Sequence, residues 1–178
     1  MCGIVGFVDT LKASGSETLH RTVQRMASTL IHRGPDDGGS WVDAACGVAL
    51  GHRRLSILDL SPEGHQPMCS ADGRFMTVFN GEIYNFVELR EHLESVGRTF
   101  RSTSDTEVLL EGFSHWGFEQ TLRKCVGMFA LAVWDTSQRI LYLARDRMGE
   151  KPLYYGWQRG IFVFGSELKA LRAHPKWK

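Results

Sequence analysis

The stretch Met128-Phe129-Ala130-Leu131-Ala132-Val133-Trp134 is apolar at every position, without the alternation of apolar and polar side chains that marks a half-exposed strand. This pattern is typical of a strand that is covered on both faces. We therefore expect it to form an inner strand of a layered structure. Six other short stretches are strand-like and cover residues 3–8, 47–50, 75–79, 140–144, 152–155 and 161–164.

Helical patterns alternate with these strands. Apolar side chains lie on one helical face in residues 19–30, and the glycine and proline of residues 32–39 end this helix in a tight loop. Residues 167–172 look like the start of another helix. The order of elements favours an α+β sandwich, in which sheets pack on each other and helices cover the outside. Two more helices follow capping-box-like pairs, Asn85 with Glu88 and Ser104 with Glu107, and end at Gly97 and Gly117.

Length and composition fit one soluble domain, because 178 residues can bury roughly 70% of the unfolded surface. A net charge of +1 gives no electrostatic reason to expect nucleic acid or a membrane surface as partner. No apolar run approaches the roughly 20 residues that span a bilayer. The seven histidines lack ligand spacing, so no metal site is expected. The four cysteines, without an export signal, are expected to be reduced thiols in the cytoplasm.

Cys2 is a candidate nucleophile because it follows the initiator Met1. Methionine is commonly removed when the next residue is small, and Cys2 would then carry both a thiol and a free α-amine. A thiolate is the nucleophilic form of cysteine, and a free α-amine, whose unperturbed pKa is about 7.7–8.0, can accept its proton near neutral pH. The alternative is a buried small apolar side chain, which is commoner for a cysteine in an apolar stretch. A retained Met1 would consume the amine in a peptide bond.

Three other positions have side chains suited to binding or catalysis, each beside a purely structural alternative. Arg54 has a fork of donors that fits a carboxylate, although spacing alone favours a surface arginine paired with an acid. Asn80-Gly81 is a common hairpin turn, but an Asn amide beside a Gly N–H is also a donor pair for an oxyanion. Asp105 follows the capping residue Ser104, so its own carboxylate could face an ammonium group.

Two loops carry weaker signals. Residues 145–155 alternate charges and, taken alone, are typical of a solvated turn with local ion pairs. Residues 34–39 are rich in glycine but lack the lysine and the spacing of a phosphate-binding loop, so a turn is expected there.

Taken together and in this order, these segments resemble the glutaminase domain of glutamine-dependent amidotransferases with an N-terminal cysteine, and specifically the asparagine synthetase branch. Related amidotransferases that make amino sugars or purine precursors share the opening cysteine, but their segments around the arginine and the helix start look different. The segments span nearly the whole chain: they are Met1-Cys2-Gly3-Ile4-Val5-Gly6, His32-Arg33-Gly34-Pro35-Asp36 and residues 51–59, 79–85, 104–107 and 145–155.

The resemblance implies an N-terminal-nucleophile fold, a four-layer αββα sandwich with two mainly antiparallel sheets. It also implies hydrolysis of L-glutamine to L-glutamate and ammonia through a glutamyl-thioester on Cys2, whose α-amine passes the proton. Asn80 and Gly81 would hold the oxyanion. Arg54 would bind the α-carboxylate of glutamine. The groups implied around its α-ammonium are Asp105, Glu82 and the backbone of Ile57 and Leu58.

In this family the glutaminase domain precedes a synthetase domain, which activates a carboxylate with ATP and receives ammonia through an internal tunnel. We therefore expect residues 1–178 to be a single glutamine amidotransferase domain at the N-terminus of a longer polypeptide. The resemblance implies no cofactor for this domain, and ATP with magnesium for the synthetase domain. A homodimer is compatible with the sequence.

The final product and two alternative functions stay open at this level. Asparagine made from aspartate is the first expectation, and an amidated sugar or another carboxylate is equally permitted. The alternatives are an amidase that acts on a different amide and a degenerate domain that senses glutamine or binds a partner.

Overall fold

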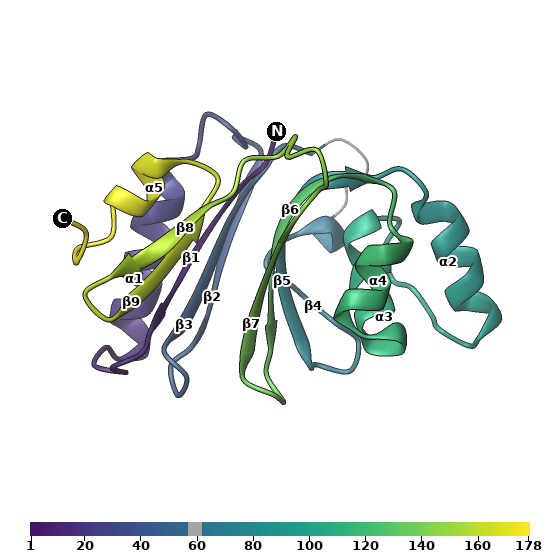
Figure 1. The fold of residues 1–178 in the computed structure, drawn as a ribbon, viewed down its shortest axis with the longest axis horizontal. Coiled ribbons are helices and arrows are strands. Elements are labelled where there is room, and N and C mark those ends of the chain that lie inside the picture. The colour runs from purple at the N-terminus through teal and green to yellow at the C-terminus, as the bar shows by residue number, and fades with distance from the viewer. Residues whose placement is uncertain (57–61) are drawn as a thin grey trace.

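Two β-sheets stacked face to face form the centre of the molecule, and helices cover the outer face of each sheet (Figure 1). The computed structural model describes residues 1–56 and 62–178. Within these residues one sheet has five strands and the other has four, and all neighbouring strands run antiparallel. These four layers confirm the α+β sandwich that the sequence pattern predicts and the αββα order that the family resemblance implies.

The first sheet has the N-terminal strand at its centre. Strand β1 pairs with β3 on one side and with β9 on the other, in the order β2-β3-β1-β9-β8. Because Gly3 begins β1, this doubly paired strand anchors the neighbouring Cys2 at one end of the sheet. The strands are β1 (Gly3–Asp9), β2 (Asp37–Asp43), β3 (Val48–Arg54), β8 (Tyr154–Gln158) and β9 (Ile161–Gly165).

The second sheet leaves part of one strand edge without a partner strand. Its order is β4-β5-β6-β7, and β4 pairs with β5 only through Met68 opposite Thr77 and Cys69 opposite Met76. Beyond Thr77, this edge of β5 is therefore not covered by β4. The strands are β4 (Met68–Cys69), β5 (Phe75–Ile83), β6 (Gly127–Asp135) and β7 (Ile140–Arg145).

The helices form the two outer layers. Helices α1 and α5 cover the first sheet, and α2, α3 and α4 cover the second (Figure 1). A short 3-10 helix, Pro62–Gly64, leads towards β4. The helices are α1 (Ser16–Ser28), α2 (Phe86–Ser95), α3 (Asp105–Trp116), α4 (Phe118–Lys124) and α5 (Leu168–Arg172).

Strand β6 explains the apolar stretch in the sequence. Leu131 and Val133 pack into the cluster beneath α2–α4, whereas Ala130 and Ala132 pack into the cluster between the two sheets. Both faces of β6 are thus buried, and each large apolar side chain buried in this way stabilises the fold by about 1.5–3 kcal/mol. The small alanines on the inner face allow the sheets to approach closely.

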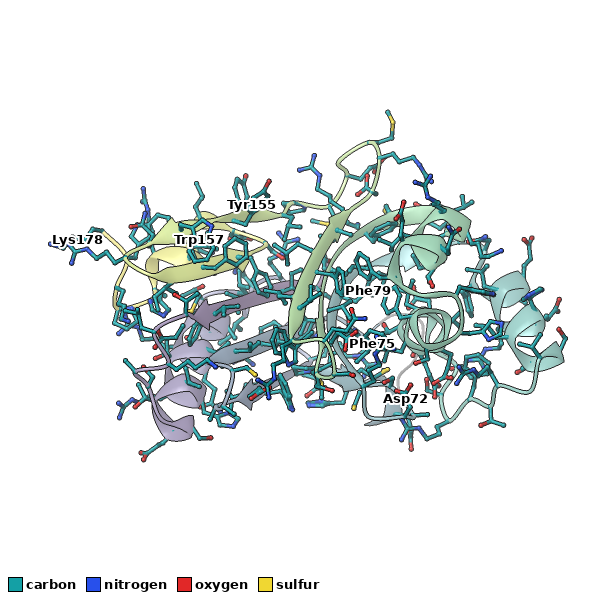
Figure 2. The ribbon with its side chains drawn as sticks, turned by 60° about the horizontal axis from the view of Figure 1, so that its bottom comes forward. Asp72, Phe75, Phe79, Tyr155, Trp157 and Lys178 are labelled. Carbon is teal, nitrogen blue, oxygen red and sulfur yellow. The ribbon has the colours of Figure 1, made fainter. Side chains whose placement is uncertain are left out.

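Aromatic side chains of strands β5 and β8 differ in burial. Phe75 and Phe79 of β5 belong to the cluster beneath the helices, whereas Tyr155 and Trp157 of β8 stand on the outer surface (Figure 2). The exposed pair explains why the pattern of β8 gives no sign of an inner strand.

Three sequence-based expectations about local structure are wrong. Residues 37–39 begin strand β2 instead of forming a turn, because they pair with β3. Asn80 and Gly81 lie inside β5 and do not form a hairpin turn. Asn85 does not cap α2 with its side chain; its Nδ2 donates to the carbonyl of Lys124 and its Oδ1 accepts from the amide of Val126. It thereby joins α2 to the start of β6.

The second capping site is confirmed. The side chain of Ser104 accepts a hydrogen bond of 3.2 Å from the amide of Glu107 at the start of α3. The chain turns at Gly117, with a φ of 83°, and continues at once into α4, a helix that the sequence reading did not anticipate.

Candidate active site

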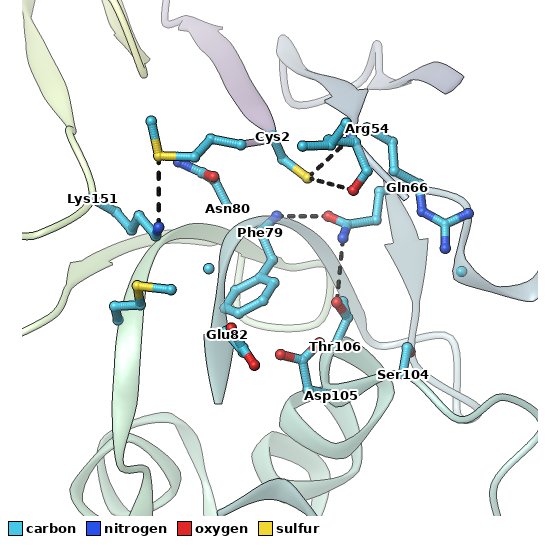
Figure 3. A pocket seen from close by; sticks show the side chains of 15 residues that line it. Cys2, Arg54, Gln66, Phe79, Asn80, Glu82, Ser104, Asp105, Thr106 and Lys151 are labelled. Carbon is cyan, nitrogen blue, oxygen red and sulfur yellow. Dashed lines mark hydrogen bonds between the residues drawn. The ribbon is translucent and has the colours of Figure 1, made fainter. Parts of the chain in front are cut away.

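A pocket of about 180 Å³ lies where β1 begins, and both sheets and the start of α3 contribute to its walls (Figure 3). This volume suits a small ligand rather than a drug-sized or larger one. The structure brings together six of the eight predicted site residues. They are Cys2, Arg54, Asn80, Gly81, Glu82 and Asp105. The other two, Ile57 and Leu58, lie outside the described residues.

Cys2 is held at the pocket by contacts on both its side chain and its backbone. Its Sγ accepts from the amide of Leu55 at 3.4 Å and donates to the carbonyl of the same residue at 3.7 Å. Its carbonyl oxygen accepts a hydrogen bond of 2.9 Å from Nε of Arg33. Arg33 is in turn paired with Glu167 at 3.1 Å. The thiol therefore has a fixed place although it precedes the first strand.

Glu167 stays ionised because of its basic neighbours. Burial raises the pKa of its carboxyl, but hydrogen bonds from His32, Arg33 and Lys169 outweigh this effect and lower the pKa to about 2. The carboxylate thus anchors Arg33, which belongs to the segment His32–Asp36 of the sequence motif. This gives the motif a physical role, because Arg33 fixes the backbone of Cys2.

Asn80 has a buried donor without a partner. Its side chain is 1% exposed, and its Nδ2 has no hydrogen-bond partner among the described residues. An unpaired buried donor costs about 1–3 kcal/mol. The even-numbered residues Met76 and Val78 of β5 face the other sheet, so Asn80 is directed to the side from which Cys2 enters the pocket (Figure 3).

The open edge of β5 presents a row of backbone N–H groups. Phe79 donates to Oε1 of Gln66 at 2.7 Å, and Ile83 donates to Oδ2 of Asp105 at 2.9 Å. Peptide groups alternate in direction along an antiparallel strand, so the N–H of Gly81 shares this edge. Gly81 therefore lies between two amides that side-chain oxygens already occupy.

A side chain larger than hydrogen does not fit at Gly81. A Cβ atom there would lie 2.4 Å from the carbonyl oxygen of Met128 and 2.7 Å from the Cα of Phe129. Both neighbours are backbone atoms of β6, which cannot move aside cheaply. Glycine is therefore required for close packing at this position.

Opposite charges line the pocket. Asp105 is 5% exposed, and burial raises the pKa of its carboxyl to about 6 in spite of the hydrogen bonds from Ile83 and Thr106. The neighbouring carboxylate of Glu82 raises this pKa further. A ligand ammonium between the two carboxylates would relieve their repulsion. Arg54, 8% exposed, supplies a guanidinium group to the same pocket.

Gln66 and Lys151 line the pocket although the sequence reading assigned neither of them to the site. Gln66 is 6% exposed and comes from the loop before β4, where no motif marks it. Lys151 is 7% exposed and its Nζ lies 3.7 Å from Sδ of Met1. Its segment, residues 145–155, is only in part the solvated turn that charge alternation suggests: Arg145, Arg147 and Glu150 are exposed, whereas Lys151 is buried. Asp146 is also buried there and accepts from the amides of Phe129 and Lys151.

Among the described residues, no group of three or more His, Cys, Asp or Glu side chains is arranged to hold a metal ion. In the same part of the chain, no helix is long and apolar enough to cross a membrane. The four cysteines are all free thiols, and Cys125 is buried, which raises its pKa to about 12.

Comparison with known proteins identifies the class to which this fold and pocket belong. The chain belongs to the glutamine amidotransferase domain family, whose model matches residues 1–178. It is 45% identical over 177 residues to asparagine synthetase [glutamine-hydrolyzing] 3 of Bacillus subtilis, a match that covers 98% of this chain and 28% of that protein. It is also 36% identical over 189 residues to amidase chry2 of Gibberella zeae, covering 99% of this chain and 28% of the relative.

A solved structure has the same fold. The glutamine phosphoribosylpyrophosphate amidotransferase from B. subtilis superposes with a TM-score of 0.77 and 22% sequence identity, over 97% of this chain and 43% of that one. At this identity the likeness concerns the fold alone. The chain spans between about a quarter and about a third of the length of these curated relatives.

Proposed function

We propose that this domain hydrolyses L-glutamine to L-glutamate and ammonia, with Cys2 as nucleophile. The observation that carries the proposal is the buried Nδ2 of Asn80, which lies in the pocket that Cys2 lines and has no hydrogen-bond partner in residues 1–56 and 62–178. An acyl-transfer site needs donors that are unpaired before the reaction and become paired with the oxyanion in the transition state. The family match and the open edge at Gly81 support the same conclusion.

The reaction has two halves. After removal of Met1, the α-amine of Cys2 accepts the thiol proton, and Sγ bonds to the amide carbon of glutamine while the carbonyl π electrons move to oxygen. Nδ2 of Asn80 and the N–H of Gly81 donate to this oxyanion. When the C–N bond breaks, the amine's proton goes to the leaving NH₂ group, which departs as ammonia. Water then attacks the thioester with the same amine as base, and glutamate leaves as Cys2 regains its proton.

Glutamine is held by its α-amino and α-carboxylate groups. Arg54 pairs with the carboxylate, because a guanidinium fork matches two carboxylate oxygens. Asp105 and Glu82 hold the ammonium group. The backbone of Ile57 and Leu58 is the remaining predicted contact. One small, largely buried pocket thus contains both a positive group and negative groups. This supports selection of a free amino acid, which carries both charges, over a peptide.

We further propose that the ammonia serves a synthetase domain of the same polypeptide, which activates its acceptor with ATP and magnesium. Two findings support this: the chain spans only 28% and 26% of the length of two relatives, and both relatives are named asparagine synthetase [glutamine-hydrolyzing]. Asparagine is the proposed product. The cytoplasm is the proposed compartment, because four unpaired thiols suit a reducing environment. The homodimer stays a prediction.

The test is glutamate release from glutamine by full-length protein whose intact mass shows loss of Met1. We expect release to stop after treatment with a thiol-directed glutamine analogue, and to be absent in Cys2→Ala. Cys69→Ala is the matched control, because Cys69 is also a half-buried free thiol and lies outside the pocket. Undiminished hydrolysis in Cys2→Ala would overturn the mechanism, and turnover of another amide instead of glutamine would overturn the substrate.

A further inference from the structure

We propose that Gln66 is a positioning residue of the oxyanion hole, which it sets by fixing the open edge of β5 and tying it to the start of α3. This inference rests on the proposed glutamine hydrolysis. It concerns a residue outside the sequence motifs, and it follows from four hydrogen bonds around the pocket.

The first step concerns the peptide groups of Phe79, the residue before Asn80. Its N–H donates to Oε1 of Gln66 at 2.7 Å, and its carbonyl accepts from Nε2 of His52 at 3.0 Å. Both groups lie where β4 has already ended. Phe79 is 3% exposed, so water cannot replace these partners without cost. Gln66 and His52 thus take the place of the missing strand.

His52 fixes the carbonyl from the opposite sheet. A carbonyl oxygen only accepts, so Nε2 of His52 carries the proton. Burial lowers the pKa of this imidazole to about 4, although the hydrogen bond to Phe79 acts in the opposite direction. The imidazole is therefore neutral at neutral pH. This hydrogen bond links β3 to β5, and the charge of the His52 imidazole does not change near neutral pH.

Gln66 is the member of this arrangement that also reaches the ammonium side of the pocket. Its Nε2 donates to Oγ1 of Thr106 at 3.3 Å, and Thr106 follows Asp105 in the first turn of α3. One side chain thus spans from the strand that carries the oxyanion donors to the helix that carries the carboxylate (Figure 3). Since both of its polar ends are used, its amide orientation is fixed.

The consequence is geometric. The Phe79 and Ile83 amides on the open edge are each capped by a side chain, Gln66 at one and Asp105 at the other, with Gly81 between them. Loss of the Gln66 cap would free the Phe79 amide and allow the strand to shift at Asn80. A displacement of about 1 Å of a catalytic group can cost on the order of 100-fold in rate. Ground-state contacts with the α-amino and α-carboxylate groups would change much less.

The experiment compares three variants of the full-length, Met1-processed protein. Gln66→Leu removes both hydrogen bonds, and Gln66→Glu keeps the acceptor for the Phe79 amide. Thr77→Val is the matched control, because Thr77 is 1% exposed on the same strand, its hydroxyl bonds to the carbonyl of Ala132, and it does not line the pocket. For Gln66→Leu we expect kcat to fall by about 10- to 100-fold while KM changes less than about 3-fold. Gln66→Glu should recover most of this loss, and Thr77→Val should stay within about 2-fold of wild type.

A second readout separates positioning from general damage to the fold. The aldehyde carbon of glutamate γ-semialdehyde forms a bond with Sγ of Cys2, and its oxygen then lies in the oxyanion hole. Glutamate, in contrast, binds only through ground-state contacts. Gln66→Leu should weaken binding of the aldehyde by about the same factor as the loss in kcat. It should leave the inhibition constant of glutamate unchanged. Part of the aldehyde is cyclised in solution, but this fraction is the same for every variant. The ratio of the aldehyde's inhibition constants between variants therefore does not depend on it.

The outcomes distinguish the two proposals. Equal kcat and equal aldehyde affinity in wild type and Gln66→Leu would overturn the role of Gln66 while glutaminase activity stands. A parallel loss of aldehyde and glutamate affinity would also overturn it, because it would indicate a damaged pocket. A processed wild-type protein that neither releases glutamate nor binds the aldehyde would instead overturn the proposed function.

Discussion

The carboxylate of Asp105 accepts a hydrogen bond of 2.9 Å from the backbone amide of Ile83, so the first residue of α3 is tied directly to the last residue of β5. This bond uses one oxygen of a carboxylate that we propose as a ligand for the substrate's ammonium group. Under the proposed function, Asp105 would therefore have two duties: it ties down the end of β5, and its charge would bind the substrate's ammonium group.

Glutamine binding should weaken in acid because of Asp105. Its pKa of about 6 means that the carboxylate becomes protonated as the pH falls through 6. A neutral acid cannot pair with the ammonium group, so KM should rise about 10-fold for each unit below pH 6, with a smaller change in kcat. Steady-state kinetics between pH 5 and 8 measures this. Asp105→Asn should show a high KM without this acid limb, and an unchanged limb in that variant would assign the titration to another group.

The same substitution should stabilise the protein at neutral pH. The folded-state pKa of Asp105 is raised above its unfolded value, so folding opposes ionisation, and stability is lost as the pH rises from 4 through 6. Asp105→Asn keeps an oxygen for the Ile83 amide and removes the buried charge. We expect a gain of about 1–3 kcal/mol in the free energy of unfolding at pH 7.5 and little gain at pH 4. Urea denaturation at the two pH values tests this; a loss of stability at pH 7.5 would contradict it.

Asn80→Ala should reduce catalysis much more than stability. Removal of one oxyanion donor costs about 100- to 1,000-fold in kcat. Because Nδ2 has no partner in the part of the chain that the structure describes, its loss also relieves an unsatisfied buried donor, and the free energy of unfolding should fall by less than about 1 kcal/mol. Measuring kcat and the free energy of unfolding on the same preparation distinguishes a catalytic role of Asn80 from a structural one. A large loss of stability with normal kcat would indicate a purely structural asparagine.

Gly64→Ala should impair substrate binding through Arg54. A Cβ at residue 64 would lie 2.0 Å from an Nη atom of Arg54, and this flexible end of the side chain can move aside. The guanidinium group would leave its place, so KM for glutamine should rise about 10-fold with little change in kcat. Gly156→Ala is the control, because its Cβ would meet no atom within 4 Å. Equal KM values in both variants would show that the position of Arg54 is not critical.

Glu167→Gln should weaken the support of the nucleophile. The pKa of Glu167 is depressed to about 2, so its contribution to stability is complete above its unfolded value and disappears as the pH falls towards 2. We expect a loss of about 1 kcal/mol at pH 7, shrinking at pH 3, and a lower kcat because Arg33 loses its anchor. Denaturation at both pH values checks the first expectation; a constant difference would show that the ion pair is not its cause.

The sequence by itself indicated the layered fold, and its resemblance to a known family supplied the candidate site residues. Residues 128–134 predict an inner strand because burial on both faces excludes polar residues from every position, and composition records this directly. Ser104 predicts the start of α3 because capping is a contact between residues close in the chain. Ordered motifs pointed to six residues that the structure brings to one pocket: Cys2, Arg54, Asn80, Gly81, Glu82 and Asp105.

Only the tertiary structure decided which groups support these residues. Gln66 and Phe79 are 13 positions apart, and Arg33 and Glu167 are 134 apart. Such contacts leave no periodic signal in the chain, because each partner is set by how two separate elements pack. The same reason explains why β2, the burial of Lys151 and the role of Asn85 were not predicted: a strand edge, a buried cation and a side-chain bridge exist only once distant segments have met.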